Sequence, residues 1–138
     1  MTQETALYQF FSGFHVPKYE GVQFVPDPEK PLPAYPTNAP DGAMLPYLTY
    51  PPKAGYNRSR GSLTVQIWMY TESVTEISCI VQEIAERLGY GGATLHCDGG
   101  TIVLYRDDDN FDTSTSGQGD SNMKVRMLNI TAQFNIMR

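Results

Sequence analysis

The residues with the chemistry of a catalytic or metal site are few and widely spaced. The chain has two histidines, His15 and His96, and two cysteines, Cys79 and Cys97. His96 and Cys97 are neighbours in a β-rich segment, and adjacent strand residues point to opposite faces, so they cannot form a nucleophile–base pair. No phosphate-binding loop, dinucleotide fingerprint, nucleophile elbow or zinc-protease motif is present. We therefore predict that the protein is not an enzyme and uses no cofactor or metal.

The two cysteines are also too few and too far apart for a zinc ribbon or a disulfide framework. We expect two reduced thiols, with a single disulfide between them as the alternative.

An acidic segment, residues 107–120, is the second place where residue types suggest chemistry. Its acidic residues are Asp107, Asp108, Asp109, Asp112 and Asp120. Alternating carboxylates can bind Ca²⁺, but the glycine and the closing glutamate of an EF-hand loop are missing, which favours a solvated loop. The chain has 10 Lys+Arg and 15 Asp+Glu, so its net charge of −5 equals the charge of this segment. Phe111 is the apolar residue of the segment, and we expect it to act as an anchor.

Basic residues form one small group before the main predicted strand, Lys53, Arg58 and Arg60. Three charges give only weak, salt-sensitive binding to nucleic acid, so an acidic protein surface is an equally good partner. No run approaches the ~18 apolar residues of a membrane span, and the N-terminus lacks the basic and apolar regions of a signal peptide. We expect a soluble protein that is made in the cytoplasm and has no membrane partner.

Local patterns predict the elements that position these residues, beginning with a helix over residues 2–13. Thr2 suits its N-cap and Gly13 its end. All 10 prolines lie before residue 53. Because proline lacks a backbone donor and fixes φ, it is excluded from helix interiors and central strands. We therefore predict that residues 15–45 form a proline-rich extended arm.

The remainder of the chain alternates between strand and helix patterns. Strands are predicted at residues 46–50 near a sheet edge, at 62–71, on both sides of an Asp98-Gly99 turn, and at 123–136. The apolar residues of 123–136 switch phase, which predicts a bulge or a change of buried face near Met127 and Leu128. Residues 107–122 are polar and contain glycine, so they are predicted to be a loop.

The best-specified element is a helix at residues 73–88. Ser73 and Glu76 have the spacing of a capping box, and an apolar stripe follows. Glu83 and Arg87 are predicted to pair on its outer side.

These elements predict a single domain over residues 1–138, with an N-terminal helix (1–14), the arm (15–45) and an α+β core (46–138). We expect a mixed, mainly antiparallel sheet of about four to five strands, with two helices packed on one face. The helix at 73–88 joins two strands by a crossover, which allows one parallel pair.

Aromatic residues mark the expected contact surface. Trp68 and Tyr70 lie on the face of the strand 62–71 that is opposite its aliphatic face, and Tyr47 and Tyr50 belong to the preceding strand. Aromatic residues in such positions frequently anchor interfaces. We predict that a neighbouring subunit or its proline-rich arm covers them, and the alternative is that the chain's own arm does.

Several segments resemble those of a known family. They are residues 7–14 (LYQFFSGF), 32–36 (LPAYP), 39–50 (APDGAMLPYLTY), 65–68 (VQIW), 73–88, 97–100 (CDGG) and 104–106 (LYR). Together with the long final strand, they resemble the tail terminator, or tail completion, proteins of long-tailed phages of the non-contractile type. This family is also labelled minor capsid or head–tail joining protein.

The resemblance implies a small structural protein without an active site that closes into a ring, typically a hexamer, on the head-proximal end of the tail tube. Such a ring stops tube polymerisation and joins the head connector, while DNA passes through its lumen without specific binding. The implied partners are other copies of the chain, the major tail tube protein and the head–tail connector or stopper protein. The implied location is the virion tail or neck, after assembly in the cytoplasm of the bacterial host.

The resemblance also gives the acidic segment two candidate roles. Its residues either contact the tube along the ring axis or line the lumen. The alternatives for the whole protein are another head–tail connector or neck protein, or a non-phage enzyme domain that binds a small molecule or a metal.

Overall fold

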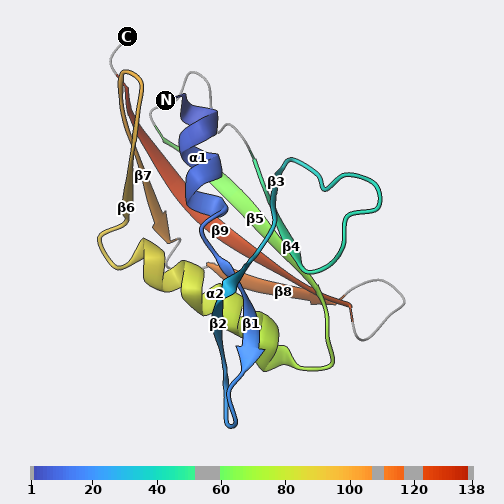
Figure 1. Cartoon of the computed structure of the whole chain (residues 1–138). Coiled ribbons are helices and arrows are strands. Elements are labelled where there is room, and N and C mark those ends of the chain that lie inside the picture. Colours follow the sequence, from blue (N-terminus) through green and yellow to red (C-terminus); the bar gives the residue numbers. More distant parts are fainter. Residues whose placement is uncertain (1, 52–59, 107–110, 117–122, 137–138) are drawn as a thin grey trace.

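The computed structural model describes residues 2–51, 60–106, 111–116 and 123–136. Within these ranges the fold is α+β, and Figure 1 shows two helices in front of a large sheet. The elements are α1 (Gln3–Phe11), β1 (His15–Tyr19), β2 (Phe24–Pro31), β3 (Ala34–Pro36), β4 (Tyr47–Tyr50), β5 (Arg60–Tyr70), α2 (Val74–Leu88), β6 (Ala93–Cys97), β7 (Gly100–Arg106), β8 (Asp112–Ser116) and β9 (Met123–Ile136).

The main sheet contains seven of the described strands, in the order β3-β4-β5-β9-β7-β6, with β8 also pairing with β9. This is more than the four to five strands that the sequence predicts. All its pairs are antiparallel except β3–β4, which is parallel. The parallel pair is therefore not formed across α2, because β5 and β6 lie at separate positions in the sheet.

Strand β9 is the central element of this sheet. It pairs with β5 in an unbroken register from Arg60↔Gln133 to Tyr70↔Met123. On its other side it pairs with β7 along one half and with β8 along the other half. The predicted change of buried face is confirmed, because Val125 is buried on one face and Leu128 on the other. The alternative, a bulge, is absent from this described register.

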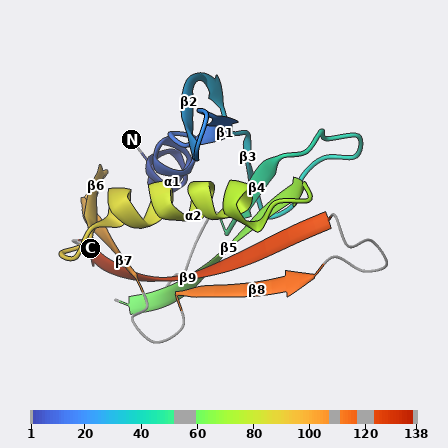
Figure 2. The same ribbon diagram turned by 90° about the horizontal axis from the view of Figure 1, so that it is seen from below.

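Both helices cover the same face of the main sheet, as predicted, and Figure 2 shows them on one side of β5 and β9. Thr2 caps α1, because its Oγ1 accepts a hydrogen bond from the Thr5 amide at 3.1 Å. The α2 cap differs from the predicted capping box. Ser73 is the N-cap residue without a side-chain cap bond, and its amide donates to Thr71 Oγ1, which in turn donates to Glu76 Oε2.

The core lies between this sheet face and the helices. Its fully buried side chains include Leu7, Phe11, Phe14, Leu48, Leu63, Ile67, Ile77, Ile80, Ile84 and Leu88. The apolar stripe of α2 packs against β7 and β9 of the sheet, and the phenylalanines of α1 belong to the same core. Neither helix in the described part of the chain is long and apolar enough to cross a lipid bilayer.

Residues 15–45 do not form the predicted extended arm. Strands β1 and β2 make an antiparallel hairpin, and β3 joins the main sheet through β4. The prolines are accommodated because both strands of a two-stranded sheet are edges, where a missing backbone donor can face outward. Figure 1 shows the hairpin beside α2, with its turn reaching past the body of the molecule.

The predicted loop at 107–122 also contains regular structure. Residues Asp112–Ser116 form β8, which pairs with the first half of β9. The segment is polar because β8 lies at an edge of the sheet, and its threonines and serines still have high or moderate β propensity.

The hairpin is fastened to α2 at its base. Glu83 accepts hydrogen bonds from the His15 backbone amide (2.8 Å) and from His15 Nδ1 (2.7 Å). Arg87, the predicted partner of Glu83, instead donates to the Gly13 carbonyl at 3.2 Å and lies 5.0 Å from the centre of the Phe14 ring. Both side chains of the expected helix-surface pair therefore hold the segment that follows α1.

Replacing Glu83 with alanine should destabilise the protein by about 1–3 kcal/mol, because it leaves a half-buried backbone amide without an acceptor. Urea denaturation measures the loss. Glu86→Ala is the matched control, since Glu86 is exposed and bonds only Gln82 within its own helix at 3.2 Å, a contact of about 0.2–0.5 kcal/mol. Equal losses for the two variants would show that the hairpin base is not held by Glu83.

Candidate interaction surface

The face of the main sheet turned away from the helices, called here the outer face, is covered by no described helix (Figure 2). The alternation of side chains along β5 and β9 shows which residues lie on the outer face. Leu63, Val65 and Ile67 face the helices and are buried, so the residues between them face outward. Trp68 is directly opposite Tyr47 on one side and Val125 on the other.

Aromatic and aliphatic side chains cluster at one end of the outer face, and we call this cluster the aromatic patch. Its members are Tyr35, Tyr47, Trp68, Tyr70, Val125 and Met127. The Tyr47 and Trp68 rings stack with centroids 6.3 Å apart, and the Tyr35 ring meets Tyr47 edge-on at 5.7 Å. Tyr70 is 57% exposed, whereas Val125 is 5% exposed. The patch is therefore pre-ordered by its own stacking and still offers apolar surface to solvent.

Around this patch, the outward positions of β5 from Ser62 to Tyr70 and of β9 from Met123 to Asn135 carry no formal charge. From Ser62 to Tyr70 on β5, every outward residue is Ser, Thr, Gln or aromatic. From Met123 to Asn135 on β9, every outward residue is Met, Val, Asn, Thr or Gln. In a chain of net charge −5, such a surface can approach a second copy without burying an unpaired charge, which would be costly.

Three of the four aromatic residues expected at an interface belong to the patch, and Tyr50 does not. Tyr50 is 3% exposed and stacks on Phe11 with ring centroids 4.8 Å apart. Tyr47 and Tyr50 are three positions apart in one strand, so they point to opposite faces. Tyr50 is thus a core residue on the helix side. The patch also contains Tyr35, which lies in the predicted arm, and Val125 and Met127, which the sequence did not assign to a contact surface.

Two residues of the acidic segment have structural partners. Asp112 forms a two-point ion pair with Arg126 on β9, through Nε at 2.9 Å and through Nη2. Arg126 Nη1 also donates to Ser78 Oγ of α2 at 3.0 Å. Phe111 packs against the core, and its carbonyl accepts from the Asn129 amide at 2.8 Å. Phe111 and Asp112 therefore hold β8 in place, rather than forming an exposed anchor within a charged rim.

The remaining charged candidates lie largely outside the described residues. Asp107, Asp108, Asp109 and Asp120 are among them, and so are Lys53 and Arg58. The backbone of Arg60 begins β5 opposite Gln133.

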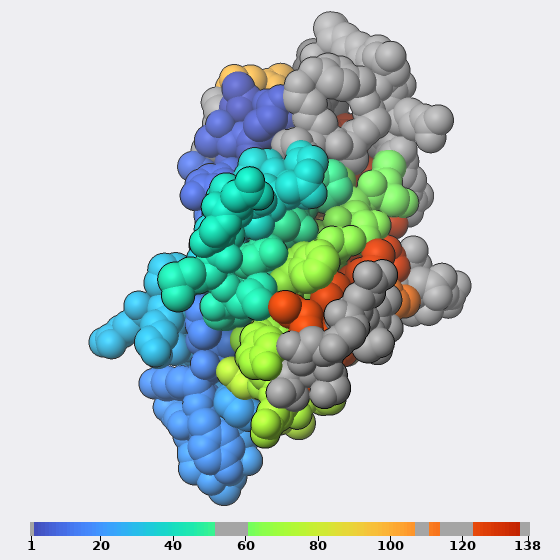
Figure 3. Space-filling model, turned by 90° about the vertical axis from the view of Figure 1, so that its right-hand side faces the viewer, coloured from blue at the N-terminus to red at the C-terminus, as the bar shows by residue number. Residues whose placement is uncertain are grey.

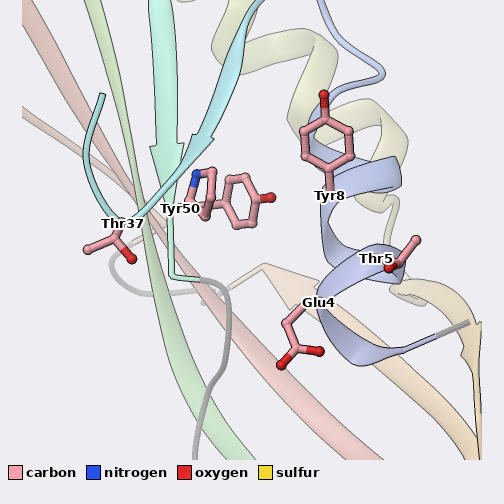
Figure 4. A pocket seen from close by; sticks show the side chains of 6 residues that line it. Glu4, Thr5, Tyr8, Thr37 and Tyr50 are labelled. Carbon is pink, nitrogen blue, oxygen red and sulfur yellow. The ribbon is translucent and has the colours of Figure 1, made fainter. Parts of the chain in front are cut away.

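An open groove of about 510 Å³ lies between α1 and the β3–β4 edge. Its lining residues are Glu4, Thr5, Tyr8, Pro36, Thr37 and Tyr50. In Figure 4 the Tyr50 ring points from β4 towards α1, and Tyr8 stands on α1 facing the same space. The lining holds one carboxylate and no thiol or imidazole, so it does not assemble a nucleophile with a base.

The two cysteine thiols are unpaired and have raised pKa values. Cys79 and Cys97 are both free. Burial raises the pKa of the Cys79 thiol, and nearby Glu83 raises it further. Burial and Asp98 likewise raise the pKa of Cys97. A raised pKa lowers the thiolate fraction at neutral pH, and the thiolate is the reactive form. Within the described ranges, no three or more His, Cys, Asp and Glu side chains gather as a metal site.

Comparison with known proteins gives no family assignment. No protein-family model matches the chain, and no curated protein sequence matches it significantly.

Proposed function

We propose that the chain is a structural protein that assembles with copies of itself through the aromatic patch. The observation that carries this proposal is the part of the outer face from Ser62 to Tyr70 of β5 and its β9 partners, which is uncharged and presents stacked aromatic side chains on a regular sheet. Contiguous exposed apolar surface rimmed by polar residues is typical of protein contact sites. The polar remainder of the face suits an interface that contains bridging water.

We further propose that the assembly is a ring, in the role of a phage tail terminator. The resemblance of the sequence to that family supports this role, and so does an α+β fold with two helices on one sheet face. The ring caps the head-proximal end of the tail tube, stops its polymerisation and provides the surface for the head–tail connector. Its binding partners are then the major tail tube protein and the connector or stopper protein, and its location is the tail or neck of the virion.

Capping requires that the ring bind the last tube ring better than a further tube subunit does. A phage that lacks this protein should therefore make tails of uncontrolled length that do not join heads. Electron micrographs of a deletion mutant measure both properties, and complementation with the intact gene is the control. Tails of normal length joined to full heads would contradict the terminator role.

A further inference from the structure

The tip of the β1–β2 hairpin is a second exposed apolar cluster. Tyr19 is 63% exposed and Val22 is 88% exposed, and the Phe24 ring lies 5.2 Å from that of Tyr19. From residue 19 to residue 26 the one charged side chain is Glu20, which pairs with Lys18 at 3.3 Å. The tip, meaning residues 19–24, therefore exposes large apolar side chains, and Lys18 balances its one charge.

The hairpin is held at its base and not at its tip. Glu83 binds His15 at one end of β1, and the Leu32 amide donates to the Phe14 carbonyl at 2.8 Å just beyond β2. Figure 3 shows the turn as a blue projection, separate from the green and red surfaces of β5 and β9. Both strands of the hairpin contact α2, whereas its turn reaches past the body of the molecule (Figure 1). A contact at the tip would thus stabilise the hairpin as well as the assembly.

The other strongly exposed large apolar residues are isolated. They are Tyr8 beside the groove, Met44 in the loop before β4, Val74 at the start of α2 and Tyr90 after its end. Tyr90 also lies under the guanidinium of Arg106, 5.0 Å from its ring centre. Among the described residues, the hairpin tip and the aromatic patch are therefore the two places where exposed apolar side chains gather.

We propose that the hairpin tip of one copy docks on the aromatic patch of the next copy. The inference rests on the proposed self-assembly and names the two surfaces that meet. The hairpin lies on the helix side of the sheet and the patch lies on the outer face (Figure 2). A contact between two different surfaces on opposite sides of a subunit is heterologous, and it propagates from copy to copy until the rotation closes a ring.

The hairpin tip and the aromatic patch match in size and in charge. The patch extends over β3, β4, β5 and β9, which are three strand spacings or roughly 14 Å across. A two-stranded hairpin with its side chains has a width of roughly 10 Å, so its tip fits within the patch. The patch has no charge to pair, and the one charge of the tip is already paired with Lys18. Docking consequently leaves no unpaired charge at the centre of the contact.

Two charge-introducing variants test this contact. Val22→Asp places a carboxylate on the tip, and Tyr70→Asp places one on the patch. Both sites are exposed in the single chain, so circular dichroism and thermal melting should be unchanged. Each variant alone should lose at least about tenfold in association strength, measured by sedimentation velocity. Tyr90→Asp, at a fully exposed site after α2, is the control and should assemble as the unmodified protein does.

An equal mixture of the two variants gives the decisive measurement. The intact patch of the Val22→Asp chain can accept the intact tip of the Tyr70→Asp chain, so mixed dimers should form and grow no further. Tyr19→Ala, which removes a tip ring without adding charge, should weaken association in the same direction. Normal assembly of both tip variants would overturn the proposal, and so would a mixture that stays monomeric. An unmodified protein that is monomeric at about 100 μM would overturn it too.

The outcomes also separate this contact from the proposed ring. Open filaments that dissolve on Val22→Asp substitution would support the tip–patch contact and contradict the ring. A closed ring that is insensitive to both tip variants would support the ring and contradict the tip–patch contact.

Discussion

Replacing Trp68 with alanine should dissociate the assembled protein and leave a folded monomer. Trp68 lies in the middle of the aromatic patch, between Tyr47 and Val125. Truncating a central aromatic anchor of an interface costs at least about 2 kcal/mol, or roughly a thirtyfold weaker association. The monomer loses the stacking on Tyr47, worth about 0.5–1.5 kcal/mol, and the packing on its cross-strand neighbour Val125, while the buried helix-side face of β5 is untouched. Light scattering over a concentration series measures the first effect, and urea denaturation measures the second.

Tyr90→Ala provides the comparison for Trp68→Ala, because it removes a fully exposed aromatic ring from a surface outside the patch. It should leave the molar mass in solution unchanged. An assembly that forms normally with alanine at position 68 would show that the patch is not the contact surface.

Replacing Arg126 with alanine should lower the free energy of unfolding by about 1–3 kcal/mol, because three hydrogen bonds that involve charged groups are lost. The Arg126 side chain is 14% exposed and that of its partner Asp112 is 28% exposed, so the pair is partly shielded from water. Without the guanidinium, the Asp112 carboxylate loses both of its hydrogen bonds and Ser78 loses its contact with the sheet. Chemical denaturation with one cooperative transition is the appropriate measurement.

The conservative variant separates charge from geometry at this site. Arg126→Lys keeps the positive charge but cannot form the two-point pair. Its loss in free energy of unfolding should therefore be smaller than that of Arg126→Ala. Lys30→Ala removes an exposed cation from β2 and should change stability by less than about 0.5 kcal/mol. A melting temperature of the Arg126→Ala variant within one degree of that of the unmodified protein would show that the Asp112–Arg126 pair does not hold β8 and α2 together.

Elements with strong local signals could be predicted from the sequence. The Thr2 cap of α1, the apolar stripe of α2 and the Asp98-Gly99 turn each depend on residues a few positions apart, and each is present in the structure. The alternation along β5 also identified Trp68 and Tyr70 as residues of the outer face. The same alternation places Tyr50 and Tyr47 on opposite faces, so the core position of Tyr50 could also have been predicted.

Other features depend on tertiary partners that local patterns do not reveal. The hairpin β1–β2 contains prolines that exclude a central strand, yet a two-stranded sheet has no central strand. Its attachment joins His15 to Glu83, which are 68 positions apart. The sequence of β8 is typical of a polar loop. The segment is a strand because it pairs with β9 and because Asp112 forms an ion pair with Arg126. The partner of Asp112 could not be predicted, because Arg126 lies 14 positions away on another strand.

The position of β9 in both the chain and the sheet has a consequence for biosynthesis. β9 follows every other described strand in the chain, yet β5, β7 and β8 all pair with it. A nascent chain on the ribosome can form α2 and the β6–β7 hairpin early, but it cannot join the two halves of the main sheet until Met123 to Ile136 have been synthesised. Folding therefore waits for contacts of large sequence separation, which slows it. A translation product that ends before β9 would lack the sheet that carries the aromatic patch, so only chains synthesised through β9 could enter an assembly.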